Sequence, residues 1–364
     1  MLIVLGLSLP GRAWSRTVAM QQPCANCHTM HNSQNAATVN GARQDALMKG
    51  DCVGCHTKTS GVGFDEGGII KPFVWHMADP GYNEMAVSTQ PTLAGGDFYW
   101  VADGTPLRDD LKGHNVAGIA VQVSRTAPGD LAAKVYDIDN PLTCAGVNGC
   151  HGDGTGTQVQ QQVVSIWGSH HSNAPIDGSS PKASYRMLYG RSNNVLGGVL
   201  GAEDPDWEYT LSATDRNQYK GELRSLSDAS ASAAFISSSC ARCHSNFHND
   251  DDTGNTGTAD LAFASPWIRH PVDIDIGGRG SEYAYGTGGT AALFQVQTPL
   301  GSETFMNPPR ATLNLDAQNG EAIITCISCH RAHGSPYDYS LRWNYQAWPV
   351  GGYNGCGDCH TTKN

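Results

Sequence analysis

Twelve cysteines in six close pairs, each pair followed directly by a histidine, constrain this chain of 364 residues more than any other feature. The five regular motifs read Cys-x-x-Cys-His and are Cys24-Cys27-His28, Cys52-Cys55-His56, Cys240-Cys243-His244, Cys326-Cys329-His330 and Cys356-Cys359-His360. The third motif along the chain is wider, with five residues between Cys144 and Cys150 and then His151. Two such thiols add to the two vinyl groups of a porphyrin, and the adjacent histidine reaches the iron. The sequence therefore predicts six covalently bound haem c groups.

The wide third motif can serve the same chemistry if its extra residues loop out. Gly146 and Gly149 lie inside it, and glycine makes such a loop sterically easy. We therefore interpret Cys144 and Cys150 as attachment residues and His151 as an iron ligand.

Three other uses of paired cysteines fit the pattern less well. Zinc ribbons need no histidine after the second cysteine, whereas here it follows in all six pairs although only 14 residues are His. Disulfides between such near neighbours would close strained loops. Six copies of a redox-active Cys-x-x-Cys in one chain would have no use.

Subtracting the six motif histidines leaves eight others, enough to supply a second axial ligand to each of six irons. They are His31, His76, His114, His170, His171, His248, His270 and His333. Iron with two histidine ligands is saturated, so it passes electrons but does not readily bind a substrate. This pattern favours an electron-transfer protein without catalytic residues over a haem enzyme.

Spacing suggests how several of these ligands are used. His31, His248 and His333 closely follow attachment motifs, on the side that the proximal histidine already occupies, so we expect each to ligate a neighbouring haem. His114 and His270 are further candidates. No histidine follows the third motif directly, which makes His170 or His171 its expected ligand and leaves His76 in reserve.

Composition favours an irregular fold that depends on its cofactors. The chain has 43 Gly, 39% apolar residues and a mean hydropathy of -0.36, which is little for a large protein-only core. We expect mostly coil with short helices leading into the motifs, as at 44–49 and 231–239, and few short strands, as at 97–102 and 119–123. The long Gly/Asp/Asn/Ser stretches would be ordered by haem contacts.

The chain ends and the charge indicate an exported protein. Residues 1–15 combine a short apolar run with a small-x-small sequence and are predicted to be the remnant of a signal peptide, leaving residues 16–364 as one domain. No later stretch approaches the ~20 apolar residues of a membrane span. A formal charge of -11 makes nucleic acid an unsuitable partner.

The motifs and their flanks resemble the family of extracellular hexahaem cytochromes that assemble into electron-conducting filaments. The matching segments lie in the same order and are 24–33, 95–101, 112–115, 240–244 with His248, 269–271 and 326–333. The resemblance implies a loop-rich fold around a continuous haem stack. It also implies that His31 ligates the fifth haem, at Cys326, Cys329 and His330, of the next subunit.

The chain departs from that family in its wide third motif, which lacks a directly following second histidine, and in its shorter length. The expected function is extracellular electron transfer along a filament, with other redox proteins and extracellular acceptors as partners. The alternatives are a monomeric periplasmic or outer-membrane-associated electron carrier and a multihaem reductase.

Overall fold

A computed structural model describes residues 23–29, 33–34, 37–38, 47–59, 63, 65–66, 69–83, 91–103, 109–130, 133–156, 162–192, 195–223, 232–244, 270, 272–279, 285, 291–347 and 351–360. The predicted signal-peptide remnant, His31 and His248 lie outside these ranges. All twelve cysteines, all six motif histidines and the other six candidate ligands lie within them.

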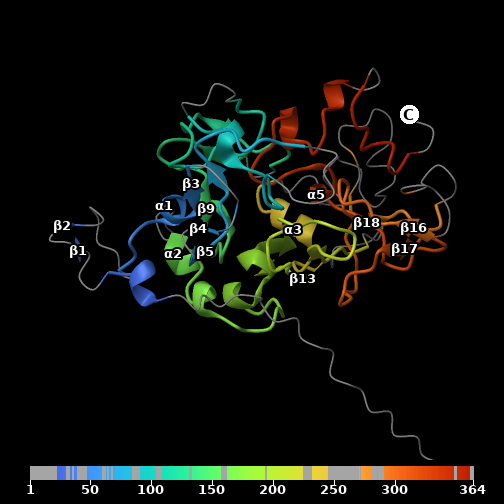
Figure 1. Ribbon diagram of the computed structural model, residues 1–364, viewed down its shortest axis with the longest axis horizontal. Helices are drawn as coiled ribbons and strands as arrows, with labels where there is room; N and C mark the ends of the chain where they lie inside the picture. Colours follow the sequence, from blue (N-terminus) through green and yellow to red (C-terminus); the bar gives the residue numbers. More distant parts are fainter. Residues whose placement is uncertain are drawn as a thin grey trace, which may run out of the picture.

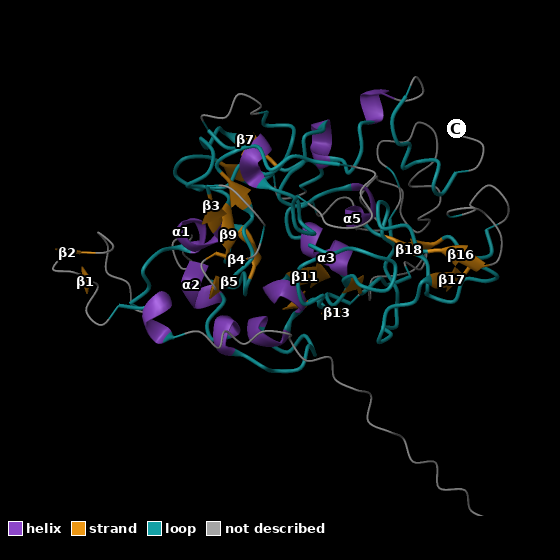
Figure 2. Ribbon diagram, viewed as in Figure 1, coloured by secondary structure: helices purple, strands orange, loops and turns teal. Residues whose placement is uncertain are grey.

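Loops dominate the fold, and the helices between them are short (Figure 2). The α-helices are α1 (Cys52–His56), α2 (Gln162–Ser165), α3 (Ile236–Cys240) and α5 (Cys326–Cys329). The 3-10 turns are η1 (Cys24–Asn26), η2 (Phe98–Trp100), η3 (Ser169–His171), η4 (Pro181–Ala183), η5 (Tyr185–Met187), η8 (Asp338–Ser340) and η9 (Tyr345–Ala347). Helices of one turn are unstable alone, so these depend on tertiary contacts.

The strands are equally short, and each pairs with a single partner. They are β1 (Ser33–Gln34), β2 (Ala37–Thr38), β3 (Thr57–Lys58), β4 (Asp65–Glu66), β5 (Ile69–Ile70), β6 (Trp75–His76), β7 (Arg125–Thr126), β8 (Val135–Tyr136), β9 (Thr143–Ala145), β10 (Gly149–His151), β11 (Tyr189–Ser192), β12 (Val195–Gly198), β13 (Gly201–Ala202), β14 (Gln218–Tyr219), β15 (Ile274–Asp275), β16 (Ala291–Leu293), β17 (Thr312–Asn314) and β18 (Ile323–Ile324). Every sheet in the described ranges has two strands. The predicted fold class, mostly coil with short helices and short strands, is confirmed.

Individual elements differ from the sequence-based expectation. The aromatic run predicts a strand at 97–102, but residues 98–100 form η2, where the Asp97 carboxylate accepts a hydrogen bond from the amide of Tyr99. Residues 119–123 form a turn and coil rather than a strand. Of the two expected helices, the one before Cys240 is present as α3, whereas residues 47–50 are not helical.

Three small hydrophobic clusters, rather than one core, hold the described residues together. One surrounds Phe98 and Val116, one surrounds Tyr185 and Ile236, and the largest surrounds Tyr285. The elements that bear motif cysteines are spread through the molecule, with α1, β9, α3 and α5 following one another along its long axis (Figure 1). No helix in the described part of the chain has the length and apolarity of a membrane span.

Candidate haem-binding sites

Each regular attachment motif is built on a tight turn. In four of them the amide of the motif histidine donates a hydrogen bond to the carbonyl of the first cysteine, four residues earlier, at 2.8–3.1 Å. The second motif forms α1, where the Asp51 carboxylate accepts from the amide of Gly54 and caps the helix. The fifth forms α5, which begins with a capping box between Thr325 and Ser328. One helical turn brings the two thiols and the histidine of a motif together.

The wide third motif reaches a similar result by another route. Its two halves, β9 and β10, pair in parallel, with Thr143 opposite Gly149 and Ala145 opposite His151. This register places Cys144 and Cys150 side by side. Gly149 is required for the close approach, because a Cβ there would lie 2.5 Å from the Ala145 nitrogen. The predicted loop is therefore present, and Gly146 turns it with a φ of 89°.

Five of the six motif histidines face a second histidine ring. The centroid separations are 6.1 Å for His28–His171, 6.3 Å for His56–His170, 6.2 Å for His114–His244, 6.4 Å for His151–His333 and 6.1 Å for His270–His360. The angles between the ring planes range from 19° to 78°. All five non-motif rings belong to residues that the sequence singled out.

These separations fit an iron between the rings. A metal–nitrogen bond to histidine is about 2 Å, and the nitrogen lies roughly 1 Å from its ring centre. Two imidazoles on opposite sides of one metal therefore have centroids about 6 Å apart, as observed. Direct ring stacking would bring the centroids closer, as in the 4.7 Å separation of Phe98 and His333.

In several motif histidines, and in the candidate ligand His114, a backbone carbonyl holds the ring nitrogen Nδ1. The Nδ1 atoms contact the carbonyl oxygens of Pro72 (from His56), Ala332 (His114), Arg186 (His151), Pro128 (His244) and Tyr339 (His330) at 2.7–2.8 Å. A hydrogen bond from Nδ1 fixes the tautomer and leaves Nε2 free for a metal, which is the usual arrangement around metal-ligating histidine. Sequence reasoning missed these acceptors because backbone carbonyls leave no residue signature.

The histidine rings pair differently from one expectation. His170 or His171 is the predicted partner of the third motif, but in the structure the two rings face His56 and His28 of the second and first motifs. Their place goes to His333, which turns away from its own fifth motif toward His151. Because His170 and His171 are consecutive residues of η3, the first two sites must lie close together.

Among the described residues, His330 and His76 are the two histidines whose rings do not face a second histidine ring. His330, of the fifth motif, is exposed, and its Nδ1 contacts the Tyr339 carbonyl. His76 is 1% exposed, and its Nδ1 contacts the Asp97 carboxylate at 2.6 Å. Burial raises the pKa of Asp97, and the bond from His76 opposes that rise. No local sequence pattern predicts this His–Asp pair.

Cysteines of consecutive motifs lie near one another. Side-chain hydrogen bonds join Cys52 with Cys144 and Cys240 with Cys326. Coulombic interactions link Cys27 with Cys55, Cys150 with Cys240 and Cys243, and Cys329 with Cys356. The six motifs therefore form a row in the order of the sequence. A thiol converted to a thioether does not titrate, so these contacts give position and no pH dependence.

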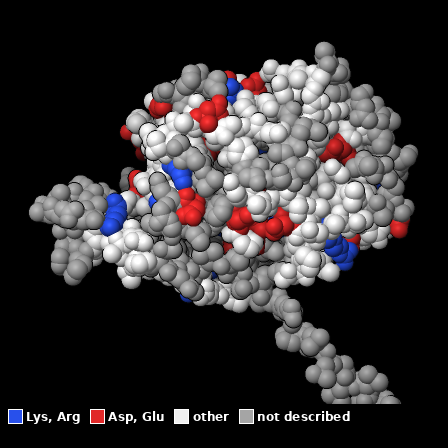
Figure 3. Space-filling model, in the orientation of Figure 1, with Lys and Arg blue, Asp and Glu red and all other residues white. Residues whose placement is uncertain are grey.

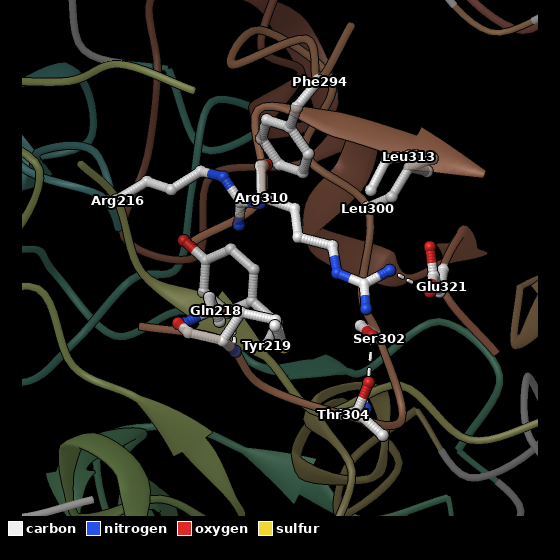
Figure 4. Close-up of a pocket in the computed structure, with 11 residues that line it drawn as sticks. Arg216, Gln218, Tyr219, Phe294, Leu300, Ser302, Thr304, Arg310, Leu313 and Glu321 are labelled. Carbon is white, nitrogen blue, oxygen red and sulfur yellow. Dashed lines mark hydrogen bonds and ion pairs between the residues drawn. The ribbon is translucent and has the colours of Figure 1, made fainter. Parts of the chain in front are cut away.

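None of the twelve cysteines, all of which lie in the described ranges, forms a disulfide bond. Among the residues described, no group of three or more His, Cys, Asp or Glu side chains gathers as a metal site. The best-defined pocket, lined by residues such as Arg216 and Phe294 (Figure 4), holds about 20 Å³, room for roughly one water molecule. An ion pair between Arg310 and Glu321 lies along its wall.

The chain is similar to known cytochromes. Residues 317–364 match the doubled CXXCH motif family. The chain is 26% identical to the C-type cytochrome OmcS of Geobacter sulfurreducens over 88% of this chain and 78% of that protein. Two solved structures, of the Outer Membrane Cytochrome S filament and of OmcS nanowires, each cover 89% of this chain and 84% of the other, at 22% identity and TM-scores of 0.42 and 0.46. In its attachment motifs and in its sequence the chain therefore resembles the multihaem c-type cytochrome OmcS.

Proposed function

We propose that residues 16–364 form one hexahaem domain that transfers electrons along a row of six haem c groups. The twelve cysteines would attach the porphyrins, and the six motif histidines would be the proximal ligands. The distal ligands would be His171, His170, His333, His114 and His270 for motifs one, two, three, four and six. Haem supplies reversible one-electron chemistry when bound.

The observation that carries this proposal is the set of five facing histidine pairs at the separation that one iron spans. A protein that supplies both axial ligands closes the iron to substrate, so these residues hold a relay and not a catalytic centre. The proximity of cysteines in consecutive motifs also supports the proposal, because it would place neighbouring haems close together. The protein's part is therefore to fix ligands, exclude exogenous ones and keep neighbouring sites close.

For the fifth motif we propose a ligand from another molecule. The exposed His330 ring faces no histidine of its own described chain, and the sequence resembles cytochromes that form filaments. His31 of the next subunit would complete this site and continue the row from one subunit to the next. The assembled protein would work outside the cell and pass electrons to other redox proteins or extracellular acceptors.

Intact mass and spin-state measurements on the purified protein test the haem assignment. We expect six covalently attached haems per chain, all low-spin in electron paramagnetic resonance, because each iron has two histidine ligands. Fewer haems, or a high-spin signal from assembled protein, would contradict the assignment, and a high-spin signal that responds to substrate would point to the reductase.

Electron microscopy of the wild type and of His31→Ala tests assembly. We expect filaments from the wild type and discrete subunits from the variant, with His31→Ala still binding six haems. The unassembled variant should show one high-spin haem, at the fifth motif. Discrete wild-type monomers at every concentration would favour the monomeric carrier, and unchanged filaments from His31→Ala would refute its bridging role.

A further inference from the structure

The wide third motif is held by hydrogen bonds along its whole length. Within it, the Thr143 amide donates to the Asn148 carbonyl at 3.0 Å, and the Gly146 amide donates to the His151 carbonyl at 2.9 Å. From outside, the Gln162 side chain of α2 accepts from the amides of Cys144 and Ala145. The first half of the motif is therefore fixed through its N–H groups.

Carbonyl groups of the motif, and of the residue directly after it, accept hydrogen bonds from the Arg242 side chain. Its Nη2 donates to the Gly146 carbonyl at 2.9 Å, and its Nη1 contacts the carbonyls of Cys150 and Gly152 at 3.2 and 3.4 Å. Gly146 and Gly152 both have positive φ. These left-handed positions turn the backbone so that three carbonyls converge on one guanidinium.

Arg242 belongs to a different attachment motif. It lies between Cys240 and Cys243, so its backbone is anchored where the fourth haem would attach. A planar guanidinium with five fixed donors can reach several carbonyls at once, which a shorter or uncharged side chain cannot. The fit is close, because a Cβ on Gly154 would come within 2.1 Å of Nη2.

We propose that Arg242 is a positioning residue for the third haem: it closes the wide loop so that Cys144 and Cys150 stay side by side, and so makes attachment at the third motif depend on the fourth. This inference rests on the proposed attachment of haem at both motifs. A regular Cys-x-x-Cys-His turn closes by its own helical hydrogen bonds and would not need such a clamp.

The dependence on loop width gives a direct test. The full chain is produced, in a host that attaches c-type haems, as wild type, as Arg242→Ala, and as both after deletion of residues 146–148. That deletion converts the third motif to Cys-Ala-Gly-Cys-His. Arg125→Ala is the control, since the Arg125 side chain is half exposed and pairs with the Asp110 carboxylate rather than with a carbonyl of the third motif. Intact mass counts haems, and alkylation with peptide mapping locates free cysteines.

We expect six haems in the wild type and in Arg125→Ala, and five in a large fraction of Arg242→Ala, with Cys144 and Cys150 alkylated. With the shortened motif, Arg242→Ala should recover the sixth haem. Six haems in Arg242→Ala with the wide loop would overturn the inference. So would a loss at Cys240 and Cys243, or a loss that the shortened motif does not repair. Fewer than six haems in the wild type would instead count against the proposed function.

Discussion

The position of His333 in the sequence does not reveal which motif histidine its ring faces. His333 follows His330 by three positions, yet its ring faces His151, whose motif lies far earlier in the chain. Replacing it, as in His333→Ala, should leave one iron of six with an open position and give one high-spin haem in electron paramagnetic resonance. His76→Gln is the comparison variant, because the His76 ring contacts Asp97 and, within the described ranges, faces no motif histidine. A high-spin signal of equal size in both variants would contradict the assignment.

The same residue predicts how the third site responds to acid. Burial, and next the neighbouring His151, lower the pKa of His333 to about 3. An unfolded or displaced His333 would have a pKa near 6.5 and would bind a proton between these two values, whereas the native ring stays neutral. The stability from this neutral ring is therefore complete above about pH 6.5 and declines as the pH falls toward 3.

An acid titration of the low-spin absorption spectrum measures this decline. We expect a high-spin component to grow as the pH falls through that range, and His333→Ala should lack the component because it is already high-spin at neutral pH. A transition that is unchanged in His333→Ala would assign the acid response to another ligand.

At the scale of elements, the parallel pairing of β9 with β10 places Cys144 and Cys150 of the wide motif side by side. Gly149→Ala should break it, because the added Cβ would meet three backbone atoms of Ala145 within 2.6 Å. The expected result is loss of one haem of six, with Cys144 and Cys150 left free in mass spectrometry. Gly351→Ala is the control, since a Cβ there meets nothing within 4 Å. Six haems in Gly149→Ala would show that the pairing is dispensable.

Elements were predictable where local chemistry defines them and unpredictable where distant partners do. The attachment motifs predict the turns at Cys52 and Cys326, and the glycines of the wide motif predict its loop. The aromatic run at 98–100 suggested a strand, but the Asp97 carboxylate caps a 3-10 turn there instead. The Asp97 carboxylate also contacts His76, 21 residues away, and no local pattern reveals that contact.

At the scale of the molecule, the sequence predicts which histidines are candidate ligands but not which of them face one another. Surplus histidines beyond the motifs predict a second ligand for each iron, and five of them face motif histidines. Which histidine serves which motif depends on long-range folding: the His114 ring is held by the Ala332 carbonyl, 218 residues away. A chain of short elements gains its order only when such contacts join the motifs into one row.

Charge should control how such molecules associate. The formal charge is -11, haem propionates would add to it, and carboxylates outnumber basic side chains over the middle of the face in Figure 3. Like-charged subunits repel over about 30 Å at 10 mM salt and only about 8 Å at 150 mM. Assembly should therefore begin at a lower protein concentration at 150 mM salt than at 10 mM, as measured by light scattering and electron microscopy.

The salt response also distinguishes assembly through the proposed bridge from His31 to the His330 site from nonspecific association of screened surfaces. His31→Ala should remain unassembled at both salt concentrations, because screening removes repulsion but cannot replace an iron ligand. Weaker wild-type assembly at higher salt would contradict the prediction and would mean that complementary charges face each other across the junction. Aggregation of His31→Ala at 150 mM would show that screened surfaces associate without the ligand, so that the proposed bridge to His330 would not be what joins the subunits.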